Sequence, residues 1–332
     1  MKEIRWGIIG CGNVTEKKSG PAFQKATGSN LVAVMRRNEK KVRDYACRHN
    51  VPRWYTDGYQ LINDKEVDAV YIATPPGTHA YYAISAMRAG KPVYVEKPMA
   101  LNFKECEEMN RVSRETGIPL FVAYYRRTLP GFLKVKEWIH SGAIGHVRFV
   151  RISLTQSFYP EDLEPENQEW WRVVPEIAGG GHFFDLASHQ LDYLDFVLGP
   201  VSKTEGLAKN QAKKYKAEDI VAAHFVFKNG VIGSGTWCFT ADPVAEEDLL
   251  EFIGSKGKII FSTYKVIPPR LITPAGIKTY KYKNPENIQL NLVQSIVDEL
   301  LKKGKCPSTG VTAARTSRVM GEIVNSYYAK NR

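Results

Sequence analysis

Short apolar stretches alternate with amphipathic stretches along the first third of the chain. The apolar stretches predict strands at Ile4–Ile9, Asn30–Met35, Ala69–Ala73, Pro92–Val95 and Pro119–Ala123. The amphipathic stretches between them predict helices, at 38–49, 57–63, 79–89 and 102–116. Alternation of this kind is typical of right-handed βαβ units. The sequence therefore predicts an α/β domain with a doubly wound parallel sheet over residues 1–123.

After Ala123 the pattern changes to the alternation of apolar and polar residues that is typical of half-buried strands. Helices are predicted at 130–140, 178–198, 285–303 and 311–328. Strands are predicted at 147–158, 201–210, 220–228, 231–239, 249–253, 258–262 and 271–282. Short turns at 228–230 and 254–257 suit antiparallel neighbours. The sequence thus predicts an α+β domain with a largely antiparallel sheet over 124–332, whose last helix could pack back on the first domain.

Composition narrows the class of protein. The chain has 332 residues, 43% of them hydrophobic and 24% charged, which is enough for two globular domains. Its five cysteines are scattered and form no CxxC pair, which argues against a disulfide framework or a zinc cluster. No signal-peptide layout or membrane-spanning apolar run is present. We therefore expect a cytoplasmic protein without membrane association.

The net charge of +11 is distributed in basic pairs such as Lys17-Lys18 and Lys213-Lys214. Because no long basic block or nucleic-acid motif occurs, no nucleic-acid partner is expected. A phosphorylated small-molecule ligand would account for part of the charge, and solvated surface for the rest.

The segment Gly10-Cys-Gly-Asn-Val-Thr15 follows the first predicted strand and precedes a helix. It is a variant of the G-x-G-x-x-G turn, in which glycines allow close approach of a dinucleotide's pyrophosphate. Thr15 departs from the third glycine, and a purely structural turn is the alternative. The context favours dinucleotide binding, with Gly10, Gly12, Asn13 and Val14 as predicted contacts.

The end of the second predicted strand bears on the choice of cofactor. An NAD-binding chain usually places an acid there for the ribose 2′-hydroxyl, but this strand ends in Arg36 and Arg37. Arginines can pair with a 2′-phosphate that a carboxylate would repel. The sequence predicts a preference for NADP(H), with NAD(H) also possible; an exposed basic turn without this role is the alternative.

Two further segments carry candidate chemistry. Lys97 ends a short apolar strand, beside Glu96 and before Pro98, where a parallel sheet places its ligands. A surface lysine paired with the glutamate is the alternative. In the helix after Gly179-Gly-Gly181, the side chains of His182, Asp185 and His189 fall within about 60° of one another at the α-helical period. They indicate an acid–base site, a metal site or a satisfied helix terminus.

These segments resemble the glucose–fructose oxidoreductase, inositol dehydrogenase and MocA family. The resemblance lies in Gly10-x-Gly12, Ala73-Thr-Pro-Pro-x-x-His79, Glu96-Lys97-Pro98 and Gly179-Gly-Gly-x-x-x-Asp185-x-x-x-His189. It implies a Rossmann domain followed by an open-faced antiparallel sheet used for oligomerisation. It also implies that Lys97, Asp185 and His189 are catalytic. The segment Trp171-Arg172 with Pro175–Gly181 is similar to 1,5-anhydro-fructose reductases, which would place Arg172 near the sugar, unless it stacks on a neighbouring tryptophan.

The combined prediction is an NADP(H)-preferring oxidoreductase that acts on a secondary alcohol or ketone of a sugar or polyol. His189 would exchange the hydroxyl proton with Asp185 orienting it, and Lys97 would hydrogen-bond the same oxygen, or the two would exchange roles. Further predicted cofactor contacts are Thr74, Pro75, His79, Glu96 and Lys97; predicted substrate contacts are Lys97, Tyr125, Arg172 and His189. No metal is predicted. A redox-assisted glycosidase holding NAD(H) and a cofactor-sensing regulator are the alternatives.

The predicted strand Val231–Phe239 carries Trp237 and Phe239 on one face and Ile232 and Cys238 on the other. Helices could cover only one face of such a sheet, and an apolar face left open usually marks a protein interface. We therefore expect a homodimer, or a homotetramer built from such dimers.

Overall fold

The computed structural model describes residues 2–164 and 170–329, which form two compact units. Unit 1 consists of Met1–Thr128 and Asn284–Ala314, and unit 2 consists of Leu129–Lys283 and Arg315–Arg332. The first boundary lies a few residues after the predicted one. The segment Asn284–Ala314, which the sequence analysis assigned to the second domain, belongs instead to unit 1.

Unit 1 contains a six-stranded parallel sheet in the order β3-β2-β1-β4-β5-β6, which confirms the predicted doubly wound fold. Its strands are β1 (Ile4–Ile9), β2 (Ser29–Met35), β3 (Arg53–Tyr55), β4 (Ala69–Ile72), β5 (Val93–Val95) and β6 (Leu120–Val122). Its helices are α1 (Asn13–Lys17), α2 (Gly20–Lys25), α3 (Glu39–Arg48), α4 (Gly58–Asn63), α5 (His79–Arg88), α6 (Phe103–Thr116) and α10 (Leu290–Leu300). The edge strand β3 was not predicted, because its residues are only half-buried and show no apolar run.

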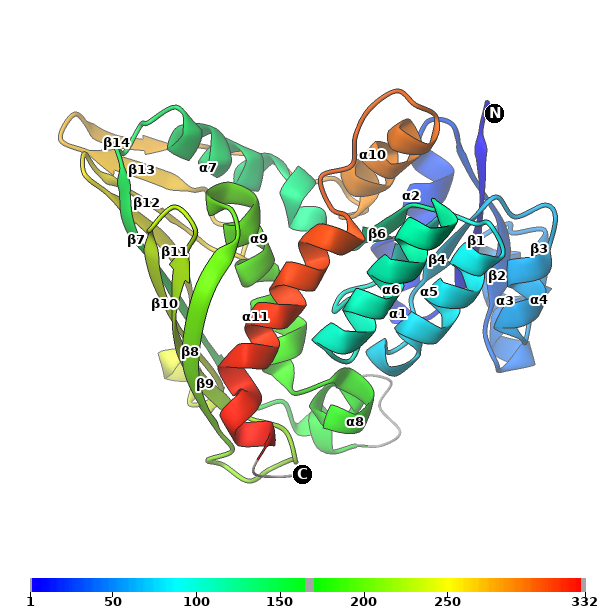
Figure 1. Ribbon diagram of the computed structural model, residues 1–332, viewed down its shortest axis with the longest axis horizontal. Coiled ribbons are helices and arrows are strands. Elements are labelled where there is room, and N and C mark those ends of the chain that lie inside the picture. The colour runs from blue at the N-terminus through cyan, green and yellow to red at the C-terminus, as the bar shows by residue number, and fades with distance from the viewer. Residues whose placement is uncertain (1, 165–169, 330–332) are drawn as a thin grey trace. The chain divides into compact units, whose positions relative to one another are not determined.

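Two apolar clusters enclose this sheet. Residues of α5 and α6, which lie side by side in Figure 1, contribute to one cluster, and residues of α2, α3 and α10 contribute to the other. The α10 helix explains why the chain returns to unit 1. Its buried side chains are Leu292, Val293, Ile296 and Val297. Burying each such side chain contributes about 1.5–3 kcal/mol, so this face of α10 is an integral part of the core of unit 1.

Unit 2 contains an eight-stranded sheet in the order β14-β13-β12-β11-β7-β10-β9-β8, antiparallel except for the parallel pair β7 and β10. Its strands are β7 (Val147–Ser157), β8 (Val201–Lys209), β9 (Ile220–Phe227), β10 (Ile232–Ala241), β11 (Glu247–Gly254), β12 (Lys258–Phe261), β13 (Arg270–Thr273) and β14 (Gly276–Thr279). The last predicted strand, 271–282, is instead the hairpin of β13 and β14, because the chain turns at Pro274-Ala275. The helices α7 (Pro130–His140), α9 (Ser188–Leu198) and α11 (Gly310–Tyr328) lie along one face of this sheet (Figure 1).

The helix predicted at 178–198 is interrupted. A short helix α8 (Pro175–Ala178) ends at Gly179, whose φ of 86° requires glycine. A π-helical turn, Phe183–Ala187, then leads into α9. The wider π turn changes which side chains share a face, and such turns often occur at functional sites.

Within the described residues, no helix is long and apolar enough to cross a membrane.

Candidate active site

Five predicted positions of unit 1 follow the carboxyl ends of five strands. Gly10 follows β1, Arg36 follows β2, Thr74 lies after β4, Lys97 after β5 and Tyr125 after β6. Because the strands are parallel, all five positions lie at the same edge of the sheet. This is the edge at which open α/β sheets bind their ligands.

The glycine turn has the form of a dinucleotide cradle. Gly10 has a φ of 93°, and a Cβ atom there would lie 2.9 Å from the backbone N of Thr74, so no larger residue fits. The backbone N–H groups of Gly10 and Cys11 donate to the carbonyl of Met35, which fixes the turn against β2. At Gly12 the nearest atom to a Cβ would be 3.9 Å away, which leaves open space before α1. Close backbone approach at Gly10 and open space at Gly12 fit a bound pyrophosphate.

The place of the missing third glycine is taken by a different arrangement. The hydroxyl of the buried Thr15 donates to the carbonyl of Gly12 at 2.8 Å. The close backbone packing for which a third glycine is usually needed occurs instead at Gly20, at the start of α2. A Cβ atom there would lie 2.1 Å from the carbonyl oxygen of Thr15 in α1. The departure at Thr15 therefore leaves the turn intact, and Gly20, which the sequence analysis missed, supplies the close contact.

The two arginines after β2 differ in their surroundings. Arg36 is half-buried, and its Nη1 donates to the carbonyl oxygen of Cys11 at 3.1 Å. Arg37 is exposed. Arg36 therefore supports the glycine turn itself, while Arg37 extends from the same turn into solvent.

His79, a predicted cofactor contact, joins two turns. It is fully buried at the start of α5, with Nε2 2.6 Å from the carbonyl oxygen of Thr74 and Nδ1 3.0 Å from that of Pro98. Burial lowers the pKa of its imidazole. With both ring nitrogens on carbonyl oxygens, His79 positions the Thr74 and Pro98 turns. The Thr78 hydroxyl lies 2.7 Å from the Thr74 hydroxyl and 3.2 Å from the Pro75 carbonyl oxygen, which further ties this turn together.

Glu96, also a predicted cofactor contact, points into the interior. Its Oε1 accepts hydrogen bonds from the Tyr71 hydroxyl and from Gln289 Nε2, each at 2.6 Å, and its Oε2 accepts from the backbone N of Lys97 at 3.1 Å. Glu96 is buried and Lys97 is half-buried. The carboxylate therefore holds the turn that carries Lys97.

In unit 2, Asp185 lies in the π turn and His189 in the first turn of α9. Asp185 Oδ2 accepts from Arg172 Nε at 2.9 Å, and the Arg172 guanidinium lies 4.9 Å from the centroid of the Trp171 ring. The structure thus shows the stacking alternative for Arg172, while its predicted contact with the sugar stays a prediction. The pairing orients the Asp185 carboxylate and partly neutralises its charge.

His189 is buried, and its ring lies 6.4 Å from the ring of Tyr264. The Tyr264 hydroxyl donates to the carbonyl of Leu186, within the π turn. Sequence reasoning missed Tyr264, because it lies in a loop after β12 that carries no motif.

The structure does not group His182 with Asp185 and His189 as the metal alternative requires. No three His, Cys, Asp or Glu side chains among the described residues are placed to hold a metal ion. His182 Nε2 lies 2.7 Å from Oδ2 of Asp162, and both side chains are nearly buried. The alternative assumed a regular α-helix at 100° per residue, and the π turn breaks that period.

Comparisons with known proteins agree with this geometry. Residues 4–124 match the model of an oxidoreductase family with an NAD-binding Rossmann fold, and residues 132–260 match the GFO/IDH/MocA C-terminal domain. Oxidoreductase P35 from Formosa agariphila is 41% identical over 319 residues, covering 96% of this chain and 97% of its own. The chain belongs to the GFO/IDH/MocA family. It is therefore an NAD(P)-dependent oxidoreductase of a family that acts on sugars and polyols.

Other members of the GFO/IDH/MocA family are more distant. The 1,5-anhydro-D-fructose reductase of Ensifer adhaerens is 30% identical over 263 residues, covering 77% of this chain and 75% of its own. A levoglucosan dehydrogenase, solved with NADH and L-sorbose, superimposes with a TM-score of 0.89 at 22% identity, covering 99% of this chain and 98% of its own. That likeness shows the shared fold.

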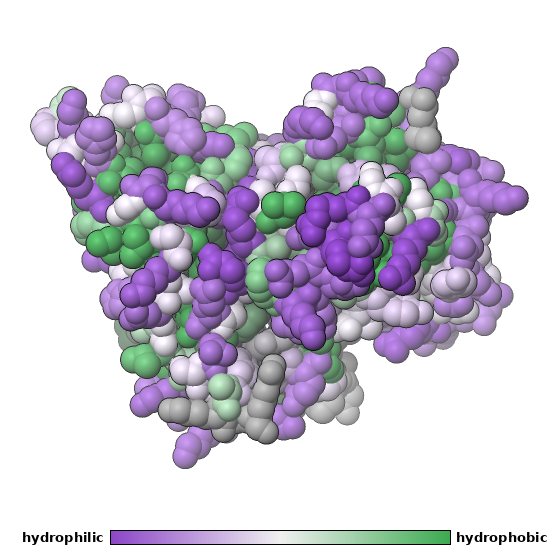
Figure 2. All heavy atoms as spheres, in the orientation of Figure 1, coloured by the Kyte–Doolittle hydropathy of each residue, from purple (hydrophilic) through white to green (hydrophobic). Residues whose placement is uncertain are grey.

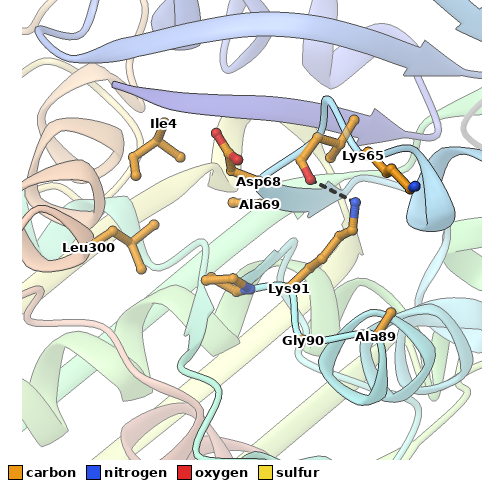
Figure 3. Close-up of a pocket in the computed structure, with 10 residues that line it drawn as sticks. Ile4, Lys65, Asp68, Ala69, Ala89, Gly90, Lys91 and Leu300 are labelled. Carbon is orange, nitrogen blue, oxygen red and sulfur yellow. Dashed lines mark hydrogen bonds between the residues drawn. The ribbon is translucent and has the colours of Figure 1, made fainter. Parts of the chain in front are cut away.

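A cavity of about 460 Å³ in unit 1 lies away from the family's cofactor edge. Ile4 and Leu300 line one side of it, and the Lys91 side chain extends along the other (Figure 3). Ile4 begins β1, so the cavity lies at the amino ends of the strands. The Lys91 ammonium donates to the carbonyls of Asp64 and Val67, at 2.5 and 2.6 Å. The Lys91 ammonium thus stabilises the backbone between α4 and β4.

Glu218 fixes the glycine segment that precedes the π turn of this family member. It is fully buried, accepts a 3.0 Å hydrogen bond from the backbone N of Gly181, and accepts a second from the Tyr328 hydroxyl. Burial raises the pKa of this carboxyl, although the two hydrogen bonds oppose the shift. Glu218 is a third residue that sequence reasoning missed, since its partners Gly181 and Tyr328 lie far away along the chain.

We expect Glu218→Gln to flatten the pH dependence of stability. Because the folded protein binds this proton more tightly than the unfolded chain, the stability it contributes is present at low pH and lost as pH rises from about 4 through the raised pKa. Glutamine keeps an acceptor for Gly181 without a buried charge. Thermal unfolding from pH 4 to 8 measures this, with the exposed Glu205→Gln as control. A variant whose stability falls with rising pH as steeply as the parent's would contradict it.

Proposed function

We propose that this family member is an NADP(H)-preferring oxidoreductase acting on a secondary alcohol of a sugar or polyol, or on the corresponding ketone. The observation that carries the proposal is Lys97 at the carboxyl end of β5, at the same sheet edge as the glycine turn. The preference for NADP(H) rests on Arg36 and Arg37, which stand where an acid would select the 2′-hydroxyl. The Ensifer adhaerens relative, named as a 1,5-anhydro-D-fructose reductase, supports a carbohydrate substrate.

The nicotinamide, when bound, supplies or accepts the hydride at C4. In the oxidation direction the substrate loses that hydride from carbon and a proton from its hydroxyl, which leaves a ketone. We propose that His189 accepts this proton. Lys97 would donate a hydrogen bond to the same oxygen and stabilise the negative charge that develops on it. To Asp185, whose carboxylate is held by Arg172, we assign the role of orienting the His189 imidazole.

Absorbance at the reduced nicotinamide band tests the proposal across a panel of keto-sugars and polyols. We expect turnover on members of that panel, faster or at lower KM with NADPH than with NADH. No turnover with either cofactor on any of them would contradict the proposal. Release of a sugar from a glycoside without net cofactor turnover would support the glycosidase alternative instead.

The arginines predict how the preference can be reversed. Because Arg37 is exposed and Arg36 holds the glycine turn, Arg37→Ala should weaken NADPH binding about tenfold and leave NADH within twofold. Arg36→Ala should weaken both cofactors, since both need the turn. Fluorescence titration of NADPH and NADH measures this, and equal losses for the two cofactors in Arg37→Ala would refute the assignment.

We also propose that the chain forms a homodimer, or a tetramer of such dimers, through the face of the unit 2 sheet that its helices leave uncovered. The strand register aligns six apolar residues across this face, with Lys258 of β12 interrupting the row between Ile253 and Ile272: Val226, Ile232, Phe149, Ile253, Ile272 and Ile277. Ile232 is 56% exposed and Phe149 43% exposed. Figure 2 shows hydrophobic side chains reaching the surface in this part of unit 2. An exposed apolar row of this kind usually marks an interface.

The five cysteines Cys11, Cys47, Cys106, Cys238 and Cys306 are all free thiols in the structure. Free thiols are typical of a reducing compartment, which supports the cytoplasm as the proposed location.

A further inference from the structure

A buried polar network lies behind the turn that carries Lys97, and it involves a residue almost two hundred positions away in the chain. Gln289 is 1% exposed, directly before α10. Its Nε2 donates to Glu96 Oε1 at 2.6 Å, and its Oε1 accepts from the Tyr94 hydroxyl at 2.6 Å. Because its oxygen is bound by Tyr94, the amide can present only its N–H group to Glu96.

The same segment also holds the far end of the first helix after the glycine turn. The backbone N of Gln289 donates to the carbonyl of Lys18 at 3.3 Å, and Asn287 Nδ2 donates to the carbonyl of Lys17 at 2.7 Å. One short segment thus contacts both the Lys97 turn and the helix that starts the cofactor cradle, all within unit 1.

We propose that Gln289 is a positioning residue for the cofactor cradle, and that it acts by donating a hydrogen bond to Glu96 and so fixing the turn that carries Lys97. This rests on the proposed use of a nicotinamide dinucleotide. A carboxylate with two side-chain donors and one backbone donor has a single preferred orientation. Hydrogen bonds to charged groups are among the stronger ones in proteins, so loss of one loosens the turn.

The test replaces the donor in two ways. Gln289→Met keeps the length of the side chain and removes both polar contacts, and we expect about tenfold weaker binding of NADPH and NADH at every pH. Gln289→Glu keeps an acceptor for Tyr94 but opposes one carboxylate with another. At lower pH the two carboxyl groups can share a proton, which restores the missing hydrogen bond. The cofactor affinity of Gln289→Glu should therefore approach the parent's as pH falls from 8 to 6.

The pKa values of four described groups near Glu96 are shifted by burial away from the range between pH 6 and 8. Burial raises the pKa of the Tyr71 and Tyr94 hydroxyls well above their ordinary value and that of the Cys306 thiol to about 11. His79, which also faces Glu96, has a pKa lowered by burial and is unchanged between variants. Dividing each affinity by the parent's at the same pH removes titration of the cofactor.

Gln294→Met is the matched control, because Gln294 lies on the same helix and bonds to the backbone of Thr27. It should lower the melting temperature without changing cofactor affinity. Tyr94→Phe is a milder variant for use if either Gln289 variant fails to fold. It frees the Gln289 amide to rotate and should weaken cofactor binding severalfold. If the parent binds no nicotinamide dinucleotide, the proposed function fails. If the parent binds one and Gln289→Glu shows the parent's affinity at pH 8, the role of Gln289 is refuted.

Discussion

His189→Ala is expected to lower kcat by about 10²–10⁴-fold, the usual contribution of a positioned proton-transfer group. The His189 side chain is buried, directly after the π turn and Ser188. Lys97→Ala is expected to fall in the same range, because it removes the hydrogen bond to the reacting oxygen. Steady-state kinetics at saturating cofactor measure both losses, and fluorescence titration should show that cofactor binding survives.

Two control variants distinguish loss of a catalytic group from a general loss of stability. His224→Ala and Lys65→Ala remove exposed side chains of the same type from units 2 and 1, and should leave kcat unchanged. If Lys97 and His189 act on one oxygen, the double variant should lose much less than the product of the single losses, as groups that act as a unit do. A folded His189→Ala variant with parental turnover would show that the catalytic assignment is wrong.

The double variant Phe149→Asp with Ile232→Asp is expected to convert the oligomer into a monomer. The two residues pair in register on β7 and β10 and are the exposed centre of the apolar row. Hot-spot side chains, which cluster near the centre of an interface, contribute about 2 kcal/mol or more each, so a charge at each of these two positions should weaken association by roughly thirtyfold. Light scattering over a concentration series measures the change in molar mass.

Leu133→Asp is the control for this prediction, because Leu133 is 44% exposed on α7, away from the open sheet face. It should leave the molar mass of the parent unchanged. A parent that is already monomeric at micromolar concentration would rule out the interface, and the apolar row would then face a different partner.

The sequence predicted the sheet of unit 1 and its ligand edge because both follow from local chemistry. Apolar runs place the strands, and Gly10, Arg36 and Pro98 mark where they end. The features that the sequence did not predict depend on packing between segments far apart in the chain. Nothing local indicates that α10 completes the core of unit 1, or that Gln289 reaches Glu96.

Unit 2 shows the other limit of sequence reasoning. Hydrophobic periodicity predicts one continuous α-helix over 178–198 and does not reveal the π turn inside it. At the α-helical period, His182 shares a face with Asp185 and His189. The structure pairs His182 with Asp162, which no motif connects to it. The motif indicated the correct segment but not which of its side chains face one another.

The discontinuous course of unit 1 has a consequence for how the protein emerges from the ribosome. Its last segment, Asn284–Ala314, is translated only after the intervening residues of unit 2. At about 5–20 residues per second, the strands β1–β6 wait roughly ten to thirty seconds for α10. During that time the apolar surface that faces Leu292 and Ile296 in the finished fold has no cover from its own chain. Nascent chains of this protein therefore present a natural binding surface for chaperones, and a gene fragment ending near residue 128 would encode a half-covered sheet.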